Sequence, residues 1–210
     1  MATNENESEK TFVHPSAEVS EQAHIGAGCR VWRQAHIREG AEIGAGSIIG
    51  AGVYVGEGVR LGRNCKVQNQ ALLYEGLTVG DGVFIGPQVC FTNDLLPRAV
   101  NPDLSLKSAE DWVLGRTVVE DGASVGAQSV VITGARIGRW ALVGAGSLVR
   151  HDVPEFALVH GRPARIRGWV CKSGHRLQVR PAPDGLVGEC PTCGATVVLP
   201  REAAAFVSEL

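Results

Sequence analysis

An apolar residue recurs at every sixth position through most of the 210-residue chain. The series runs without a phase slip from Val13 to Phe91, and it resumes from Val119 to Val149. The position four residues after each of these holds a small or modest side chain. Glycine is concentrated one and three places after the large apolar residue. A helix needs a period of 3.6 and a strand alternates with a period of two, so neither fits as a continuous element. The pattern therefore predicts short strands separated by corners, with one large and one small inward residue in each repeat.

Such hexads are typical of a parallel β-helix. Glycine suits the corners, because it adopts positive φ and lets two backbones approach closely. With three hexads in each coil, residues eighteen apart stack, and each strand pairs with its equivalent one coil away at about 4.8 Å. The twenty hexads then predict six to seven coils in an all-β chain.

Composition narrows the classes of function. The formal net charge is −2, so the chain lacks the strongly basic footprint expected when nucleic acid is the main partner. No run of about 18 apolar residues is present, which argues against a membrane span. The first eleven residues are polar and acidic, unlike a signal peptide, so a cytoplasmic location is expected. Six cysteines in such a chain are expected to be reduced or metal-bound.

The pattern divides the chain into three parts. Residues 1–11 are expected to be disordered or extended, residues 12–155 form the β-helix, and residues 156–210 form a C-terminal segment with a cysteine-containing tail. A loop at 92–118 interrupts the repeat, since Phe91 and Val119 are 28 residues apart, which is not a multiple of six. A long excursion inside a regular solenoid is usually functional, although a tolerated surface loop is the alternative. The final residues, PREAAAFVSEL, are expected to form a short helix.

A column of acidic residues follows from the eighteen-residue spacing. Glu21, Glu39, Glu57 and Glu75 should stack, and Asn93 is next in the series. Stacked like charges are destabilising, so a solvated corner bridged by Arg or Lys is expected. If the carboxyls truly stack, the lower members of the column should bind protons more readily than isolated Glu.

Four segments carry a resemblance to a known family: VHPSAEVSEQAHIGAGCRVW, CKVQNQALLYEGLTVGDGVFIGPQVCFTNDLLPR, GASVGAQSVVITGARIG and VHGRPARIRGWV. They resemble hexapeptide-repeat acyltransferases, in particular the N-acetyltransferases of UDP-2,3-diamino-uronates and dTDP-3-amino-3,6-dideoxyhexoses. The resemblance covers residues 12–178 or so. It implies a left-handed β-helix, a homotrimer with sites between neighbouring subunits, and acetyl-CoA or another acyl-CoA as co-substrate.

The expected chemistry directs attention to the loop junction. A neutral amine attacks a thioester, the carbonyl oxygen becomes an oxyanion that needs a donor, and the thiolate leaves. Asn93 and Asp94 stand where the regular coil gives way to the loop. Asp94 could accept or orient the amine proton, and Asn93 could orient it without charge. The alternative is that both only shape a turn, as Asn and Asp often do.

Further substrate contacts follow from the resemblance. The family often has Trp-His-Phe where this chain has Trp32 and Arg33, and His36 follows as a third catalytic candidate. Arg33 in place of the first His weakens a histidine-based mechanism, and the departing sulfur could take the proton instead. Trp32, Arg33, Asn69 and Arg98 are the predicted substrate-binding residues, although Asn69 fits a corner role equally well.

The donor site is expected near the C-terminal coils. Four arginines cluster there in a slightly acidic protein, and Arg suits bidentate phosphate contacts with CoA. Relatives have a G-N-P-A segment near the nucleotide, where this chain has Arg162 in place of Asn. A solvated basic turn is the alternative. The predicted cofactor-binding residues are Gly126, Ala127, Arg150, Arg162, Pro163, Ala164 and Arg165.

The tail has the spacing of a small zinc-ribbon-like appendage. Cys190 and Cys193 form a C-P-T-C-G run that suits a zinc knuckle. Its partner is imperfect, since Cys171 is followed by His175 and not by a second Cys. The four residues could form a Cys₃His site that holds a segment with little core of its own. A degenerate ribbon without metal is the alternative.

Together these features predict an acyl-CoA-dependent N-acyltransferase, with acetyl favoured, that acts on a nucleotide-activated amino sugar, in particular a 3-amino sugar. The alternatives are an O-acyltransferase, an N-acyltransferase for a non-sugar small molecule, or a non-catalytic β-helix scaffold with a structural zinc module. A γ-type carbonic anhydrase is disfavoured, because no two of the six histidines are five residues apart.

Overall fold

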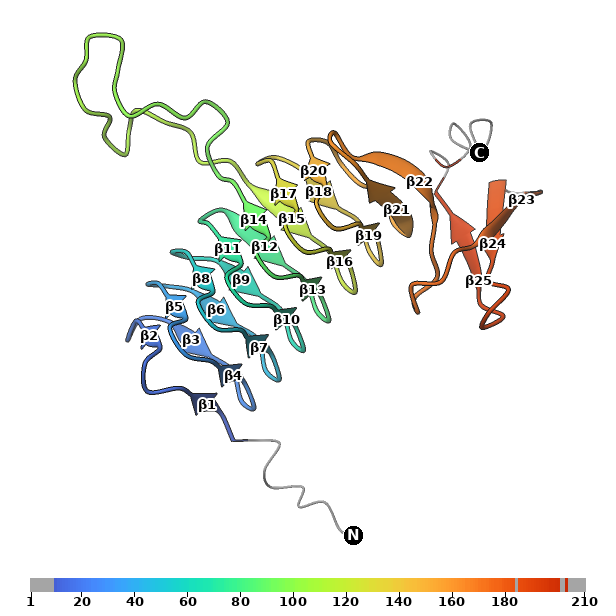
Figure 1. Ribbon diagram of the computed structural model, residues 1–210, viewed down its shortest axis with the longest axis horizontal. Coiled ribbons are helices and arrows are strands. Elements are labelled where there is room, and N and C mark those ends of the chain that lie inside the picture. Colours follow the sequence, from blue (N-terminus) through green and yellow to red (C-terminus); the bar gives the residue numbers. More distant parts are fainter. Residues whose placement is uncertain (1–9, 184, 201–202, 204–210) are drawn as a thin grey trace.

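The computed structural model describes residues 10–183, 185–200 and 203, and within them the chain is built from short strands (Figure 1). Residues 12–160 wind into stacked coils whose strands form three parallel sheets, here called the first, second and third faces. The chain passes from the first to the second face at the first corner, then to the third at the second corner, and returns at the third corner. The structure is therefore the β-solenoid that the period of six predicts.

Each face collects every third strand. The first face consists of β1 (Phe12–Val13), β4 (Arg30–Val31), β7 (Ile48–Ile49), β10 (Lys66–Val67), β13 (Phe84–Ile85), β16 (Ser124–Val125), β19 (Leu142–Val143), β21 (Ala157–His160) and β22 (Arg165–Trp169). The second face consists of β2 (Glu18–Val19), β5 (His36–Ile37), β8 (Tyr54–Val55), β11 (Leu72–Leu73), β14 (Cys90–Phe91), β17 (Val130–Val131) and β20 (Leu148–Val149). The third face consists of β3 (His24–Ile25), β6 (Glu42–Ile43), β9 (Arg60–Leu61), β12 (Leu77–Val79), β15 (Thr117–Val119) and β18 (Arg136–Ile137).

The strand register confirms the eighteen-residue coil. Val13 pairs with Val31, and Val67 pairs with Ile85, so each apolar residue lies directly over its equivalent. The inward residues from Val31 to Val149 form one continuous core along the axis. Removing a Val or Ile side chain from water stabilises a fold by about 1.5–3 kcal/mol, so the column of inward side chains holds the coils together. Among the described residues no coil lies beneath the first one, so its inward residues are less covered: Val13 is 41% exposed, and Val19 and Ile25 are half-buried.

Glycine recurs at two positions of the corners, and a different physical constraint favours it at each position. A Cβ built on Gly44 would lie 2.4 Å from the carbonyl carbon of Gly62 in the next coil, so the close stacking of corners excludes a side chain there. Gly82 instead has a φ of +65° and open space around it, so its backbone conformation favours glycine. Glutamines replace glycine at the equivalent site of the first corner, and Gln70, Gln88 and Gln128 join their side-chain amides into a ladder with N–O distances of 3.0 and 2.9 Å.

The insertion leaves the solenoid register intact. β14 ends at Phe91 and β15 begins at Thr117, so the excursion, here called the arm, spans residues 92–116. Thr117, at the end of the expected 92–118 loop, is instead buried in a strand. Cys90 pairs with Val130, 40 residues on in place of 18, so the insertion adds 22 residues. In Figure 1 the arm extends away from the coils. Among the described residues, its only β-bridge joins Val100 and Leu106.

An antiparallel strand ends the stack. β21 still runs parallel to β19, beyond the boundary expected at residue 155, and β22 then turns back along β21. β22 leads through the buried Trp169 into a three-stranded antiparallel sheet of β23 (Gln178–Ala182), β24 (Gly185–Glu189) and β25 (Thr196–Leu199). We call residues 170–199 the ribbon. The ammonium of Lys172 lies 5.4 Å from the Trp140 ring, which joins the ribbon to the third corner.

Two expectations concern residues that the structure does not describe. Residues 1–9 of the N-terminal segment, and most of the helix expected in the last eleven residues, lie outside the described ranges. Among the described residues, none belongs to a helix with the length and apolarity needed to cross a membrane.

The acidic column at the second corner is bridged by arginine, as expected. The Arg38 guanidinium binds Glu39 and lies 4.0 Å from Glu57. The hydrogen bond from Arg38 holds the pKa of Glu39 below its ordinary value, so the expectation that a stacked carboxyl would bind protons more readily is wrong for Glu39. The reason is that Arg38 donates a hydrogen bond to the Glu39 carboxylate and places an opposite charge beside it.

Candidate active site and metal centre

The arm leaves and rejoins the solenoid at one point of the second corner. The backbone N–H of Gly115 donates to the carbonyl of Asn93 at 2.9 Å, which closes the arm at its root. Asp94 follows, and its Oδ1 accepts from the Leu96 N–H at 2.8 Å. Asp94 thus shapes a turn, which is the alternative role considered above. A carboxylate has a second oxygen, so this turn does not by itself exclude a chemical role for Asp94.

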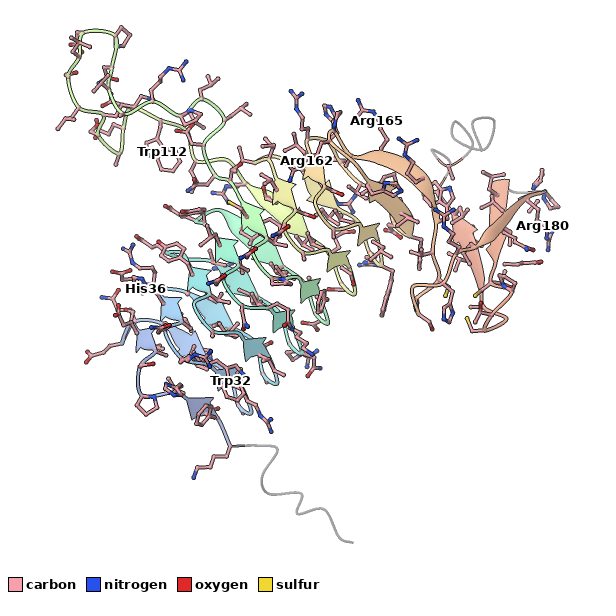
Figure 2. The ribbon with its side chains drawn as sticks, viewed as in Figure 1. Trp32, His36, Trp112, Arg162, Arg165 and Arg180 are labelled. Atoms are coloured by element: carbon pink, nitrogen blue, oxygen red, sulfur yellow. The ribbon has the colours of Figure 1, made fainter. Side chains whose placement is uncertain are left out.

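A depression of about 570 Å³ opens at the arm root. It brings three of the predicted residues together, namely Asn93, Asp94 and Arg98. Three further side chains that could contact a ligand line the same depression and were missed by the sequence analysis: Tyr74, Lys107 and Trp112. Figure 2 shows Trp112 at the base of the arm. Tyr74 could have been found from the coil spacing, since it lies eighteen residues before Thr92 at the start of the arm.

A second cavity of about 390 Å³ lies on the side of the arm root that faces the next coil. Its lining is mainly apolar and includes Leu95, Leu96 and Val113, with Thr133 and Gly134 from the next coil. Three residues border both this cavity and the open depression: Asp94, Lys107 and Trp112. The arm root therefore presents a polar hollow on one side and an apolar hollow on the other.

His36 lies on the second face, away from the arm root. Its strand β5 is followed on that face by β8, β11 and β14, so His36 lies three rungs from Cys90, or roughly 14 Å at about 4.8 Å per rung. The ring of His36 packs edge-on against Tyr54, with centroids 5.5 Å apart. Tyr54 in turn contacts Tyr74 at 5.4 Å, so aromatic rings link His36 to the depression.

The other predicted substrate residues lie at the first corner. Trp32 and Arg33 are both exposed there, and Figure 2 shows Trp32 near the N-terminal end of the stack. Asn69 occupies the same corner two coils further on, and its Oδ1 accepts from the Ala51 N–H at 2.9 Å. This bond ties two coils together, so the corner role accounts for the placement of Asn69.

The predicted cofactor residues form two groups. Gly126 and Ala127 lie at the first corner, where the Nε of Arg162 donates to the Gly146 carbonyl at 2.7 Å one coil further on. Pro163 follows Arg162 through a cis peptide bond. The second group, Arg150, Ala164 and Arg165, lines a cavity of about 230 Å³ at the end of the second face. His151 and Asp152 line this cavity as well, and sequence reasoning did not assign them.

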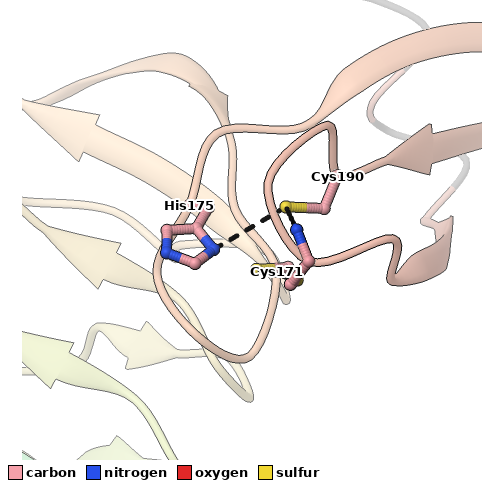
Figure 3. Close-up of side chains that lie close together, drawn as sticks. Cys171, His175 and Cys190 are labelled. Atoms are coloured by element: carbon pink, nitrogen blue, oxygen red, sulfur yellow. Dashed lines mark hydrogen bonds between the residues drawn. The ribbon is translucent and has the colours of Figure 1, made fainter.

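Cys171, His175, Cys190 and Cys193 converge in the ribbon, with all four ligand atoms within 4.8 Å of one another. The two sulfur atoms of Cys171 and Cys193 are 3.7 Å apart, and the Cys190 sulfur is 3.8 Å from Nδ1 of His175 (Figure 3). Ligands at about 2.3 Å from a tetrahedral zinc are about 3.8 Å from each other. The four residues therefore fit a Cys₃His zinc site.

Backbone donors of the ribbon favour the thiolate form of Cys190. Burial acts to raise the pKa of Cys190, but the Cys193 N–H, 3.4 Å from its sulfur, and neighbouring donors bring that pKa down to about 7. A thiolate is the form of cysteine that binds metal. By contrast, burial raises the pKa values of Cys29 and Cys65, which lie in the solenoid core as expected.

The coils and corners described above define the class of the chain. The family model described as "Bacterial transferase hexapeptide (six repeats)" matches residues 22–57. The model described as "Hexapeptide repeat of succinyl-transferase" matches residues 43–73 and 116–150. The two models thus match hexapeptide repeats in the coils on both sides of the arm.

Within this class the chain is similar to an amino-sugar enzyme. It is 53% identical over 64 residues to the dTDP-3-amino-3,6-dideoxy-alpha-D-galactopyranose 3-N-acetyltransferase of Aneurinibacillus thermoaerophilus, a match that covers 30% of this chain and 33% of that protein. It is also 45% identical over 58 residues to the bifunctional protein GlmU of Thermotoga maritima, over 27% of this chain and 13% of the relative. The chain thus spans a third or less of the length of these two relatives.

A solved structure with a similar fold is that of a mutant of perosamine N-acetyltransferase from Caulobacter crescentus, in complex with CoA and GDP-perosamine. The identity is 28% and the TM-score is 0.49, over 77% of this chain and 58% of that one.

Proposed function

We propose that the chain is an acyl-CoA-dependent N-acyltransferase that modifies the amino group of a nucleotide-activated amino sugar, with acetyl as the acyl group and a 3-amino sugar as the acceptor. The observation that carries the proposal is the depression at the arm root, where Asn93 and Asp94 lie beside cationic and aromatic side chains. The acetyltransferase activity named for the relative from Aneurinibacillus thermoaerophilus supports the same acceptor class.

In this proposal the neutral amine attacks the thioester carbon, a C–N bond forms, and the C–S bond breaks. The carboxylate of Asp94 accepts the proton that the amine loses, while its Oδ1 keeps the turn at Leu96. Asn93 orients the amine through its side-chain amide. The leaving thiolate takes that proton from Asp94, which returns to its carboxylate form, so charge and atoms balance.

The acyl donor is proposed to approach from the C-terminal coils. Arg150 and Arg165 line one cavity there, and their guanidinium groups suit the anionic nucleotide end of CoA. Arg162 stands at the neighbouring corner and already donates to the Gly146 carbonyl. Because Arg165 also donates to a carbonyl, that of Ala164 at 2.9 Å, we expect Arg150 to contribute more to CoA affinity than either Arg162 or Arg165.

The test incubates the protein with acetyl-CoA and dTDP-3-amino-3,6-dideoxygalactose and follows the acetylated product by mass spectrometry. Asp94→Asn is the informative variant, because its amide oxygen still accepts the Leu96 N–H while the negative charge is lost. We expect kcat to fall by about 10²–10⁴-fold, the usual worth of a general base. Asp103→Asn, a carboxyl farther along the arm, is the matched control and should keep wild-type activity. No turnover of any nucleotide amino sugar by the wild-type protein would refute the proposal.

His36 can be tested in the same assay. If His36→Asn lowers kcat as expected for Asp94→Asn, while Asp94→Asn has no effect, the base is His36 and the role of Asp94 is confined to the turn. Tyr54→Phe is the control, because it keeps the ring that packs against His36 with centroids 5.5 Å apart.

We also propose that the ribbon holds one structural zinc ion through its three cysteines and one histidine. The fit of the 3.7 and 3.8 Å distances to a tetrahedral site supports this assignment. Zinc would supply folding energy to a sheet with few buried side chains of its own, and no part of the transfer reaction passes through it. A homotrimer and a cytoplasmic location remain predictions, and light scattering and cell fractionation test them.

A further inference from the structure

The depression at the arm root contains two cationic side chains that the transfer step does not use. Arg98 is exposed, and its Nη1 donates to the neighbouring Pro97 carbonyl at 2.8 Å. Lys107 is half-buried and lies where the depression meets the apolar cavity. Within the described part of the chain, neither cation has a carboxylate within 4.0 Å. Two cations of this kind in one hollow are available to an anionic ligand.

The same hollow also contains two aromatic side chains. Trp112 is half-buried at the base of the arm, and Tyr74 is 38% exposed one rung before the arm begins. The ring of Tyr74 packs against the ring of Tyr54, with centroids 5.4 Å apart. Aromatic faces bind nucleobases by stacking, and the energy does not depend on which base is present.

Groups that suit an amine and groups that suit a diphosphate line the same hollow. Asn93 and Asp94 lie at the root, next to the solenoid corner, and the Lys107 N–H donates to the Ala99 carbonyl at 3.4 Å, which brings Lys107 beside the segment that carries Arg98. A ligand that carries both an amine and a diphosphate would match this set of groups. A volume of about 570 Å³ lies within the range usual for small-molecule sites.

We propose that this hollow binds the nucleoside diphosphate part of the acceptor: Trp112 stacks on the base, Arg98 and Lys107 neutralise the diphosphate, and Tyr74 contacts the sugar. The inference rests on the proposed function only for the amino sugar that the nucleotide carries. Nucleoside diphosphate binding itself is a property of this surface and can be measured without any transfer reaction.

The experiment measures binding of three probes to the full chain by titration calorimetry: dTDP, thymidine and inorganic pyrophosphate. Trp112→Leu should weaken dTDP binding by about tenfold or more, the usual worth of one stacked base, and leave pyrophosphate affinity unchanged. Trp112→Phe, which keeps a ring, should retain most of the affinity. Lys107→Met should weaken dTDP and pyrophosphate alike and leave thymidine unchanged.

Matched controls separate these effects from general damage to the surface. Lys66→Met removes an exposed cation from the first face, and Phe12→Leu removes an exposed ring from the first coil. Both should bind dTDP as the wild type does. A circular dichroism melt of each variant confirms that the coils are folded.

Two results would overturn the inference. One is dTDP binding by Trp112→Leu within about twofold of wild type; the other is an equal loss in Lys66→Met and Lys107→Met. The outcome is separable from that of the proposed function. Transfer by an enzyme whose Trp112 and Lys107 variants keep the acceptor KM refutes this site alone. The expected binding pattern in a protein that acetylates no nucleotide amino sugar refutes the transferase proposal alone.

Discussion

Replacement of Gly44 by alanine tests how tightly the corners of the solenoid stack. The new Cβ would lie 2.4 Å from the Gly62 carbonyl carbon, whereas ordinary contacts of this kind are 3.4–4 Å. The two coils must therefore separate locally by roughly 1 Å. The Gly44 N–H to Leu61 carbonyl bond, now 2.8 Å, would lengthen to about 3.8 Å and be lost.

The magnitude follows from these two effects. Overpacking against a rigid neighbour costs about 1–3 kcal/mol, and each lost hydrogen bond costs about 0.5–1.5 kcal/mol. We expect Gly44→Ala to lower the free energy of unfolding by about 3 kcal/mol. Gly82 lies at the same corner two coils further on, with a φ of +65° and no atom within 4 Å of its hypothetical Cβ. Gly82→Ala should cost only the backbone strain, about 1–2 kcal/mol.

Urea unfolding followed by far-ultraviolet circular dichroism measures both variants at one protein concentration, because any oligomerisation would make the stability depend on concentration. Gly82→Asn adds a further check, since Asn tolerates positive φ and should cost less than Gly82→Ala. If Gly44→Ala were as stable as Gly82→Ala within about 0.5 kcal/mol, close stacking would not be the reason for glycine at that position.

Three further outcomes are expected. Metal analysis should find one zinc ion per chain; Cys193→Ser or a strong chelator should remove it and unfold the ribbon, while the circular dichroism of the coils persists. The pKa of Asp81 lies below its ordinary value because its carboxylate accepts the Arg63 N–H from the coil before it. Its contribution to stability is therefore complete above the unfolded value of about 3.9 and is lost as pH falls through the lower folded value. Asp81→Asn should flatten the decline in urea midpoint below about pH 4. Gln88→Ala removes two exposed hydrogen bonds between side-chain amides of the glutamine ladder, and it should lower the free energy of unfolding in urea by about 1 kcal/mol. An unchanged urea midpoint would show that the ladder adds no stability.

The solenoid could be predicted from the sequence because each inward position repeats at a constant spacing. Once Val31 and Ile49 are known to be eighteen residues apart, their stacking follows, and so does the burial of the small residues between them. The arm root could also be located, since the period stops after Phe91 and the polar pair Asn93 and Asp94 stands at that point.

The inner lining of the depression could not be predicted in this way. Lys107 and Trp112 belong to a segment without periodicity, and their approach to Asn93 depends on how the arm folds back. The turn made by Asp94 is local and was among the roles that the sequence analysis considered, because Asp often caps the N–H two residues on. The pairing of His175 with the cysteines was suggested by spacing alone, and the structure adds the 3.8 Å approach to Cys190 that a tetrahedral site requires.

The closure of the arm at its root has a consequence for how such proteins change over time. Because Asn93 and Gly115 are joined by a hydrogen bond and the strands on either side stay in register, the 22 extra residues impose no demand on the core. An insertion of different length or chemistry could be exchanged at this point without altering a single buried side chain. New binding surfaces can therefore arise on an unchanged scaffold, by substitution of one modular segment.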